Sequence, residues 1–232
     1  PVHDRISIEV MPPQLHRVAE GKIRAALVSA GYFEAVTFSF ATDGLAERFA
    51  PTGARLCVAD PGTRKADGKL RPSILPGLLE AVRRNESVGV PNARLFELGS
   101  TFWHAPDGSI DERRRVGLAA ADDYRAVRGA VEALLGILDG TRPVRVEPAQ
   151  AEGFAPGSTG RIRWSEQDIG TIADGPADRL QHPHAEVDVP QAGLMAAAQG
   201  IGSGRVQLDG GKAPFDIMQR GLGLGLGVGP EG

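Results

Sequence analysis

The sequence predicts an α+β protein in which helices cover a largely antiparallel sheet. In three segments, apolar residues recur at three- and four-residue steps, which is the pattern of a helix with one buried face. Between and after these segments lie short stretches of alternating or continuous apolar residues, which predict strands. Most of these strands follow one another through hairpins or long loops, without regular βαβ units, and this favours an antiparallel sheet.

The three predicted helices span residues 15–30, 73–86 and 124–138. Gly31 follows the first helix at the position where a left-handed cap commonly ends a helix. Pro76 is compatible with the second helix because it falls in the first turn. The apolar face of the second helix consists of Leu75, Leu78, Leu79 and Val82, and that of the third includes Tyr124, Val127, Val131, Leu134, Leu135 and Leu138.

The predicted strands differ in how clearly the pattern marks them. In residues 36–40, Val36, Phe38 and Phe40 alternate with polar residues, which predicts a half-buried strand. Two segments with a three-residue connection predict a β-hairpin over 160–173. Further strands are predicted at 94–103, 116–121 and 185–189, and a short helix at 191–199.

Composition divides the chain into three parts. Residues 1–14 show no sustained period and contain Pro12 and Pro13, so they are predicted to be a linker from a preceding domain. Residues 15–199 carry the periodic segments and are predicted to form one core domain. Residues 200–232 are rich in glycine and are predicted to be a disordered tail, because glycine raises the entropic cost of ordering a chain.

The overall composition argues against several classes of protein. The formal net charge of −3 creates no general field that would attract nucleic acid. No apolar run reaches the length of a membrane span, so no membrane partner is predicted. The amino terminus has no signal-peptide pattern, and Cys57 is the single cysteine, which excludes an internal disulfide. These features predict a cytoplasmic protein.

The sequence suggests no catalytic residue and no metal site. His182 and His184 form the only close histidine pair, and no third or fourth ligand accompanies them. Cys57 lies in an apolar run and is predicted to be a core thiol. Arg71 is the best candidate for a phosphate-binding residue because it precedes a helix. The favoured alternative is that Arg71 braces a loop, and the charges of residues 111–115 are interpreted as solvated surface.

Several segments resemble, in the same order, the beta subunit of bacterial phenylalanine–tRNA ligase. The first is His3–Ile6, HDRI, and the second is Ala25–Phe40, AALVSAGYFEAVTFSF. The third and rarer pair is Leu70–Asn85, LRPSILPGLLEAVRRN, followed by Arg94–Phe102, RLFELGSTF. A weaker similarity spans Gly153–Gly170. The resemblance covers about residues 3–189.

This resemblance implies a class II aminoacyl-tRNA synthetase-like fold, an antiparallel sheet flanked by helices. In the family the alpha subunit carries the active site, so ATP and magnesium are expected in the holoenzyme and no cofactor on this chain. The alpha subunit is the implied partner, in an α2β2 assembly, and tRNA is reached through the holoenzyme. Residues 15–40 take the place of the class II interface motif, with candidate interface residues Leu15, Val18, Ile23, Leu27, Phe38 and Phe40. The alternative that this helix packs only on its own sheet stays open.

The resemblance also predicts which chemistry is missing. Activation of an amino acid by a class II enzyme requires cations around a triphosphate. No arginine follows the glycine-rich stretch 221–227, and by the resemblance the magnesium ligands and the flanking domains fall outside this chain. We therefore expect part of a longer subunit, or a product with an altered end, without a cationic pocket. Arginines converging with carboxylates on an open sheet face would contradict this expectation. The alternatives are a free-standing binding module and, less favoured, an active adenylate-forming ligase.

Overall fold

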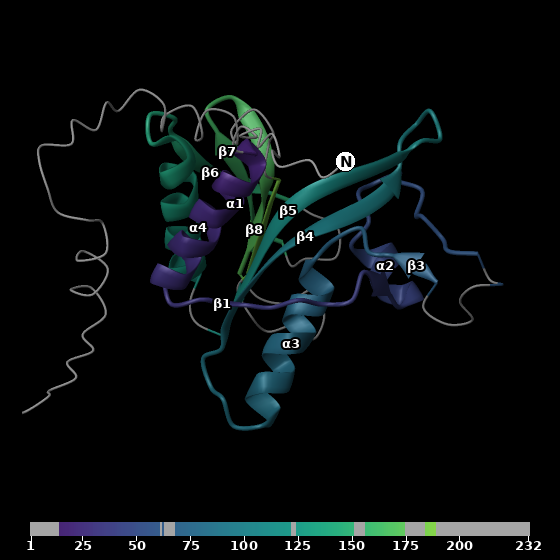
Figure 1. Ribbon diagram of the computed structural model, residues 1–232, viewed down its shortest axis with the longest axis horizontal. Helices are drawn as coiled ribbons and strands as arrows, with labels where there is room; N and C mark the ends of the chain where they lie inside the picture. The colour runs from purple at the N-terminus through teal and green to yellow at the C-terminus, as the bar shows by residue number, and fades with distance from the viewer. Residues whose placement is uncertain are drawn as a thin grey trace, which may run out of the picture.

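A computed structural model describes residues 14–60, 62, 68–121, 124–150, 156–174 and 184–188. In this part of the chain a central sheet lies between two layers of helices. Helices α1 (Leu15–Ser29) and α4 (Tyr124–Asp139) lie side by side on one face. Helix α3 (Leu75–Ser87) covers part of the other face (Figure 1). The predicted α+β class is confirmed.

The central sheet has seven strands in the order β1-β4-β5-β9-β8-β7-β6. Every neighbouring pair is antiparallel except β1 and β4, which run parallel at one edge. The strands span Phe33–Glu34 (β1), Arg94–His104 (β4), Ile110–Ala120 (β5), Val144–Ala149 (β6), Thr159–Trp164 (β7), Gln167–Ala173 (β8) and His184–Asp188 (β9).

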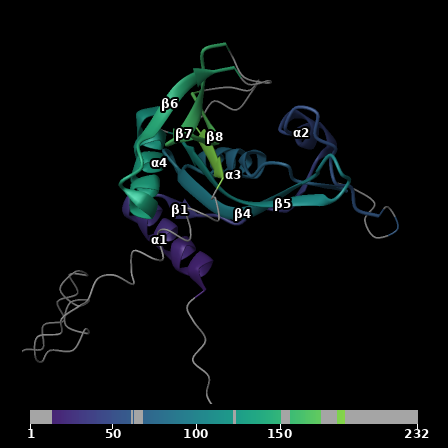
Figure 2. The same ribbon diagram turned by 90° about the horizontal axis from the view of Figure 1, so that it is seen from above.

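The long hairpin of β4 and β5 extends beyond the rest of the sheet towards a small second unit (Figure 2). That unit contains β2 (Phe40–Ala41), α2 (Asp43–Arg48) and β3 (Lys69–Leu70), and its two strands pair antiparallel. It is joined to the free edge of β4 by main-chain hydrogen bonds. The N–H of Phe102 donates to the carbonyl of Arg71 at 3.0 Å, and that of His104 donates to Arg55 at 2.8 Å.

The face of the sheet beneath α1 and α4 contains the larger apolar core. Helix α4 contributes a stripe at helical spacing, and α1 contributes Ile23 and Leu27, all fully or almost fully buried. They pack on alternate residues of the strands, including Phe96 on β4 and Trp164 on β7. Burial of each such side chain stabilises the fold by about 1.5–3 kcal/mol.

Helix α3 packs on the opposite face over a smaller apolar cluster of Ile74, Leu75, Leu78, Leu79, Val82, Ala93, Leu95 and Ala119. A glycine in β5 allows the helix to approach the sheet closely. A Cβ atom at Gly117 would lie 2.8 Å from Leu78 Cδ1, closer than real Cβ contacts, so a larger residue there would push α3 away. The predicted apolar face of this helix is therefore confirmed.

The structure corrects the sequence predictions at several places. The strand predicted at residues 36–40 is wrong, because only Phe40 and Ala41 pair, and Val36 and Phe38 are 92% and 87% exposed. Strand β5 begins at Ile110, well before the predicted 116. Strands β1, β3 and β6 and helix α2 were not predicted. The helix predicted at 191–199 and the tail predicted at 200–232 lie outside the described residues. Residues 1–13 of the predicted linker also lie outside them.

Candidate functional site

The face of the sheet that α3 covers becomes polar beyond the end of that helix. Because successive side chains of a strand point to opposite faces, every second residue of β4, β5 and β9 points to this side. Leu95 and Ala119 lie under α3, and the next positions along the strands carry charge. Glu97 and Glu186 both lie opposite Gly117 in the strand register. This polar region is the candidate site.

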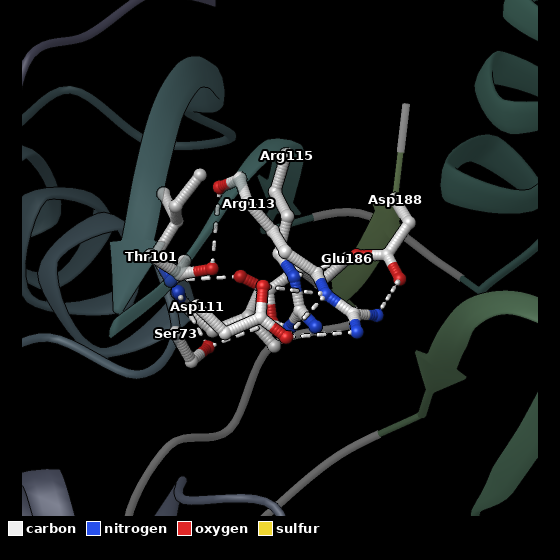
Figure 3. Close-up of polar contacts among 9 residues, drawn as sticks. Ser73, Thr101, Asp111, Arg113, Arg115, Glu186 and Asp188 are labelled. Atoms are coloured by element: carbon white, nitrogen blue, oxygen red, sulfur yellow. Dashed lines mark hydrogen bonds and ion pairs between the residues drawn. The ribbon is translucent and has the colours of Figure 1, made fainter. Parts of the chain in front are cut away.

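Two arginines of β5 converge there with three carboxylates, as Figure 3 shows. The Arg115 guanidinium lies between Glu186, with Nη1 3.1 Å from Oε2, and Asp188, with Nε 2.7 Å from Oδ1. The Arg113 guanidinium pairs with Asp111 at 3.0 Å and with Asp188 at 3.6 Å. Three carboxylates thus face two guanidinium groups, and the formal charge of the cluster is −1.

An aromatic ring supports the same two arginines. The guanidinium carbons of Arg113 and Arg115 each lie 5.1 Å from the centre of the Trp103 ring, within the range of a cation–π interaction. Trp103 is buried. The ring therefore fixes the two side chains from β4 while the carboxylates fix them from β5 and β9.

Glu186 also caps the amino terminus of α3. Its Oε1 accepts a hydrogen bond from the main-chain N–H of Ile74 at 2.8 Å, and its Oε2 accepts one from the Ser73 hydroxyl at 2.9 Å. The Ser73 oxygen in turn accepts from the N–H of Leu75 at 3.1 Å. A helix amino terminus attracts anions. Here the chain's own carboxylate takes the place that a ligand phosphate would need.

Arg71 lies in a second buried cluster on the same face. Its Nε donates to the carbonyl of Ser100 at 3.0 Å, and its Nη1 donates to the Thr37 hydroxyl at 2.9 Å and contacts Glu97 Oε1 at 2.8 Å. The side chain is 6% exposed. These contacts are the ones that the bracing interpretation describes, and they leave the guanidinium group turned away from solvent.

The convergence of arginines and carboxylates contradicts the sequence-based expectation. Residues 111–115 were interpreted as solvated surface, yet Arg115 is largely buried and paired across the sheet. Arg114 points to the opposite face, where it pairs with Glu20 of α1 at 2.8 Å. The cluster could not be predicted from the sequence because Arg115 and Glu186 are 71 positions apart. The cluster carries a formal charge of −1, so it is not a cationic pocket.

The candidate interface residues divide into two groups. Ile23 and Leu27 belong to the core beneath α1, so their side chains present no surface to a partner. Leu15, Val18 and Phe40 are partly buried, and Phe38 is exposed. Phe33 on β1, which is not among the residues predicted from the sequence, is 73% exposed. Phe33, Val36 and Phe38 are three large apolar residues exposed within six positions of one another.

The other candidates have ordinary surroundings. Among the described residues no group of histidine, cysteine, aspartate and glutamate could hold a metal ion. His182 lies outside the described part, and His184 is buried on β9. Cys57 is buried, and burial raises the pKa of its thiol, which disfavours the nucleophilic thiolate. No helix in the described part is long and apolar enough to cross a membrane.

Comparison with solved structures shows which fold the chain shares with known proteins. Two structures of the pyrrolysyl-tRNA synthetase of Desulfitobacterium hafniense superpose on this chain with TM-scores of 0.57 and 0.60. Each match covers 81% of this chain and 70% of the other, at 19% sequence identity. The fold is therefore that of the class II aminoacyl-tRNA synthetases.

Sequence comparison defines the family within that class. A family profile described as the phenylalanyl tRNA synthetase beta chain CLM domain matches residues 5–174. The chain belongs to this family, and the resemblance found in the sequence is confirmed.

Three curated relatives, each named phenylalanine–tRNA ligase beta subunit, show how much of such a subunit the chain spans. The relative from Novosphingobium aromaticivorans is 38% identical over 113 residues, which is 49% of this chain and 14% of the relative. That from Pseudomonas savastanoi is 30% identical over 70% of this chain and 22% of the relative. That from Rhodopirellula baltica is 33% identical over 65% and 23%. The chain thus spans less than a quarter of these relatives.

Proposed function

We propose that this chain is the non-catalytic core of a phenylalanine–tRNA ligase beta subunit. It supports the alpha subunit in the ATP-dependent charging of tRNA with phenylalanine, in the cytoplasm. ATP and magnesium bind in the holoenzyme, whose alpha subunit carries the active site, and tRNA is reached through the holoenzyme. The observation that carries this proposal is the pairing of every arginine in the candidate site with a carboxylate.

An activating site needs cations that are free to meet a developing negative charge. Negative charge builds on the α-phosphate during attack by the amino-acid carboxylate, and preorganised cations stabilise it. In this site each guanidinium already has a carboxylate nearby: 2.8 Å for Arg71, 3.0 Å for Arg113 and 2.7 Å for Arg115. A triphosphate would have to displace these carboxylates and leave them unpaired in a partly buried place, which is costly.

Support for the alpha subunit requires a surface on which that subunit can dock. We assign docking to the exposed apolar segment around Phe38, together with the partly buried Leu15 and Val18 at the start of α1. Contiguous exposed apolar patches mark protein–protein interfaces, and Val36 and Phe38 are both exposed two positions apart in this segment. Phe40 is half-buried at the base of the same segment.

Co-purification tests the proposal most directly. The chain is expressed with the alpha subunit of phenylalanine–tRNA ligase, and a stable complex is expected in gel filtration. A folded monomer that does not bind the alpha subunit would favour the free-standing binding module instead.

Pyrophosphate exchange tests whether the chain alone activates phenylalanine with ATP. The chain alone, mixed with phenylalanine, ATP and labelled pyrophosphate, is expected to give no exchange above buffer. The complete ligase serves as the positive control in the same assay. Exchange catalysed by the chain alone would favour the active adenylate-forming ligase.

A further inference from the structure

Three side chains from distant parts of the chain form a polar cluster, which we name the Thr37 latch: the partly buried Thr37 and the buried Arg71 and Glu97. The Thr37 hydroxyl donates to Glu97 Oε2 at 2.6 Å and accepts from Arg71 Nη1 at 2.9 Å. The Arg71 and Glu97 side chains form an ion pair at 2.8 Å and are almost fully buried. The latch therefore joins the segment after β1 to the strand β4 and to the start of α3.

The latch fixes the backbone of residues 35–39 although this segment is not a strand. The N–H of Ala35 donates to the carbonyl of Phe96 at 2.7 Å, and the N–H of Thr37 donates to Glu97 Oε2 at 3.2 Å. At the far end the N–H of Arg71 donates to the carbonyl of Ser39 at 2.8 Å. Ala35 and Thr37 are thus tied to β4 and Ser39 to Arg71, and Val36 and Phe38 between them are exposed to solvent.

Two glycines make room for the latch. A Cβ atom at Gly77 on α3 would lie 2.7 Å from Thr37 Cβ, and one at Gly99 on β4 would lie 3.0 Å from Glu97 Oε1. Both positions are in regular elements, where glycine is otherwise unfavourable. The packing around the latch thus depends on two residues without side chains.

Stability alone does not account for such a cluster. A buried ion pair can often be replaced by apolar residues of similar volume at little or no cost, because removing the charges from water offsets their attraction. What the latch does achieve is a fixed direction for two exposed apolar side chains. A segment that is already ordered loses less conformational entropy when a partner covers it.

We propose that Thr37, Arg71 and Glu97 are positioning residues, which hold Val36 and Phe38 in the conformation that docks on an apolar surface of the alpha subunit. This inference rests on the proposed function, because the alpha subunit is the partner in both. It adds the residues that act from beneath the docking segment and do not themselves touch the partner.

The test measures the dissociation constant between the chain and the alpha subunit for three variants. Thr37→Val keeps the shape and removes the hydroxyl together with both of its hydrogen bonds, and it is expected to weaken binding about tenfold. Thr37→Ser restores the hydroxyl and is expected to bind as the wild type does. The matched control is Thr159→Val on β7, which also removes a hydroxyl that makes a part-buried hydrogen bond, here to the carbonyl of Ala149. This control is expected to bind as the wild type does.

A second pair of measurements separates positioning from folding. The double variant Arg71→Met/Glu97→Leu replaces the ion pair by apolar groups, so it is expected to stay folded and still bind about tenfold more weakly. Phe38→Ala is expected to weaken binding in the wild type and to add little on the Thr37→Val background. Amide hydrogen exchange of the free Thr37→Val chain is expected to be faster at residues 35–39 and unchanged elsewhere.

The outcomes distinguish the inference from the proposed function. If the wild-type chain binds the alpha subunit and Thr37→Val binds equally well, the positioning role is overturned and the proposed function stands. Equal losses for Thr37→Val and Thr159→Val would also overturn the positioning role, because they would reflect general destabilisation. If the wild-type chain does not bind the alpha subunit, both are overturned.

Discussion

The two faces of the central sheet are built in different ways. Beneath α1 and α4 the strands present one continuous apolar surface, which extends from Phe96 on β4 to Trp164 on β7. Beneath α3 the apolar cluster ends after Leu95 and Ala119, and paired charges replace it. Both faces belong to the same strands and differ only in which alternate residues they use.

This difference indicates that one face mainly stabilises the folded domain and that the other mainly fixes the positions of side chains. The apolar face gains from every buried side chain, roughly in proportion to the area removed from water. The charged face gains much less, because each ion pair must first be taken out of water. We infer that the first face holds the domain together and that the second fixes the positions of particular groups. The predictions below test this contrast.

The largest loss of stability is expected from a substitution on the apolar face. Phe96 is fully buried beneath α1 and α4, and Phe96→Ala is expected to lower the free energy of unfolding by about 3–5 kcal/mol. Urea unfolding at neutral pH measures the change. Phe38→Ala is the matched control, because that ring is exposed, and it is expected to change stability by less than about 0.5 kcal/mol. Similar losses for the two variants would contradict the burial described here.

A somewhat smaller loss is expected under α3. Leu78 is fully buried between α3 and the sheet, and Leu78→Ala is expected to cost about 2–5 kcal/mol because it leaves a cavity. Leu135→Ala, at an equally buried position on α4, provides the comparison across the sheet. A loss under about 0.5 kcal/mol for Leu78→Ala would show that α3 does not pack as described.

A moderate loss is expected in the charged cluster. Glu186→Ala removes the cap of α3 and one of the two carboxylates that neutralise Arg115, and it is expected to cost about 1–3 kcal/mol. Glu147 on β6 is the control, since its contact with Arg163 is long and exposed, at 3.8 Å. Glu147→Ala is expected to cost under about 1 kcal/mol. Equal effects would mean that the cluster contributes no more than a surface ion pair.

The smallest effect concerns pH. Burial raises the pKa of Glu20, but the hydrogen bonds and charges of Arg114 and Arg24 outweigh it and hold the pKa below the ordinary value of 4.5. A lowered pKa in the folded state stabilises the protein above pH 4.5, and this contribution is lost as the pH falls through the folded-state value. Glu20→Gln is therefore expected to weaken the dependence of stability on pH below 4.5, by about 1 kcal/mol or less.

Unfolding curves recorded at neutral and acid pH provide the measurement for Glu20→Gln. The control is Glu132→Gln, which removes an exposed carboxylate paired with Arg128 within α4. If the wild type and Glu20→Gln lose stability equally on acidification, the ion pair between Glu20 on α1 and Arg114 on β5 does not contribute to the loss of stability at acid pH.

Local patterns predicted most of the secondary structure. The three helices and the hairpin of β7 and β8 were predicted to within two residues because their apolar periodicity is strong. Residues 36–40 show the same alternation as a strand, but their backbone is tied to side chains of Glu97 and to the main chain of Arg71. Alternation shows which side chains share a side, and it does not show whether a neighbouring strand is present. The outer half of β5 was missed because its residues are charged.

The candidate site was harder to predict than the fold. The ion pairs that link different elements join residues that are distant in the sequence, such as Arg71 with Glu97 and Arg115 with Glu186. A run of arginines has the same appearance in a sequence whether it is solvated or paired across a sheet. Only the register of β5 with β9 shows that Arg115 lies beside Asp188 and that Arg114 faces the other way.

The order of the strands has a consequence for synthesis on the ribosome. Strand β9 is the last described strand in the sequence, and it lies between β5 and β8 in the middle of the sheet. Until residues 184–188 have emerged, β1, β4 and β5 on one side and β6, β7 and β8 on the other have no strand to join them. Each half then exposes an unpaired inner edge, of the kind that invites aggregation. The nascent chain completes its sheet only when this late segment is inserted.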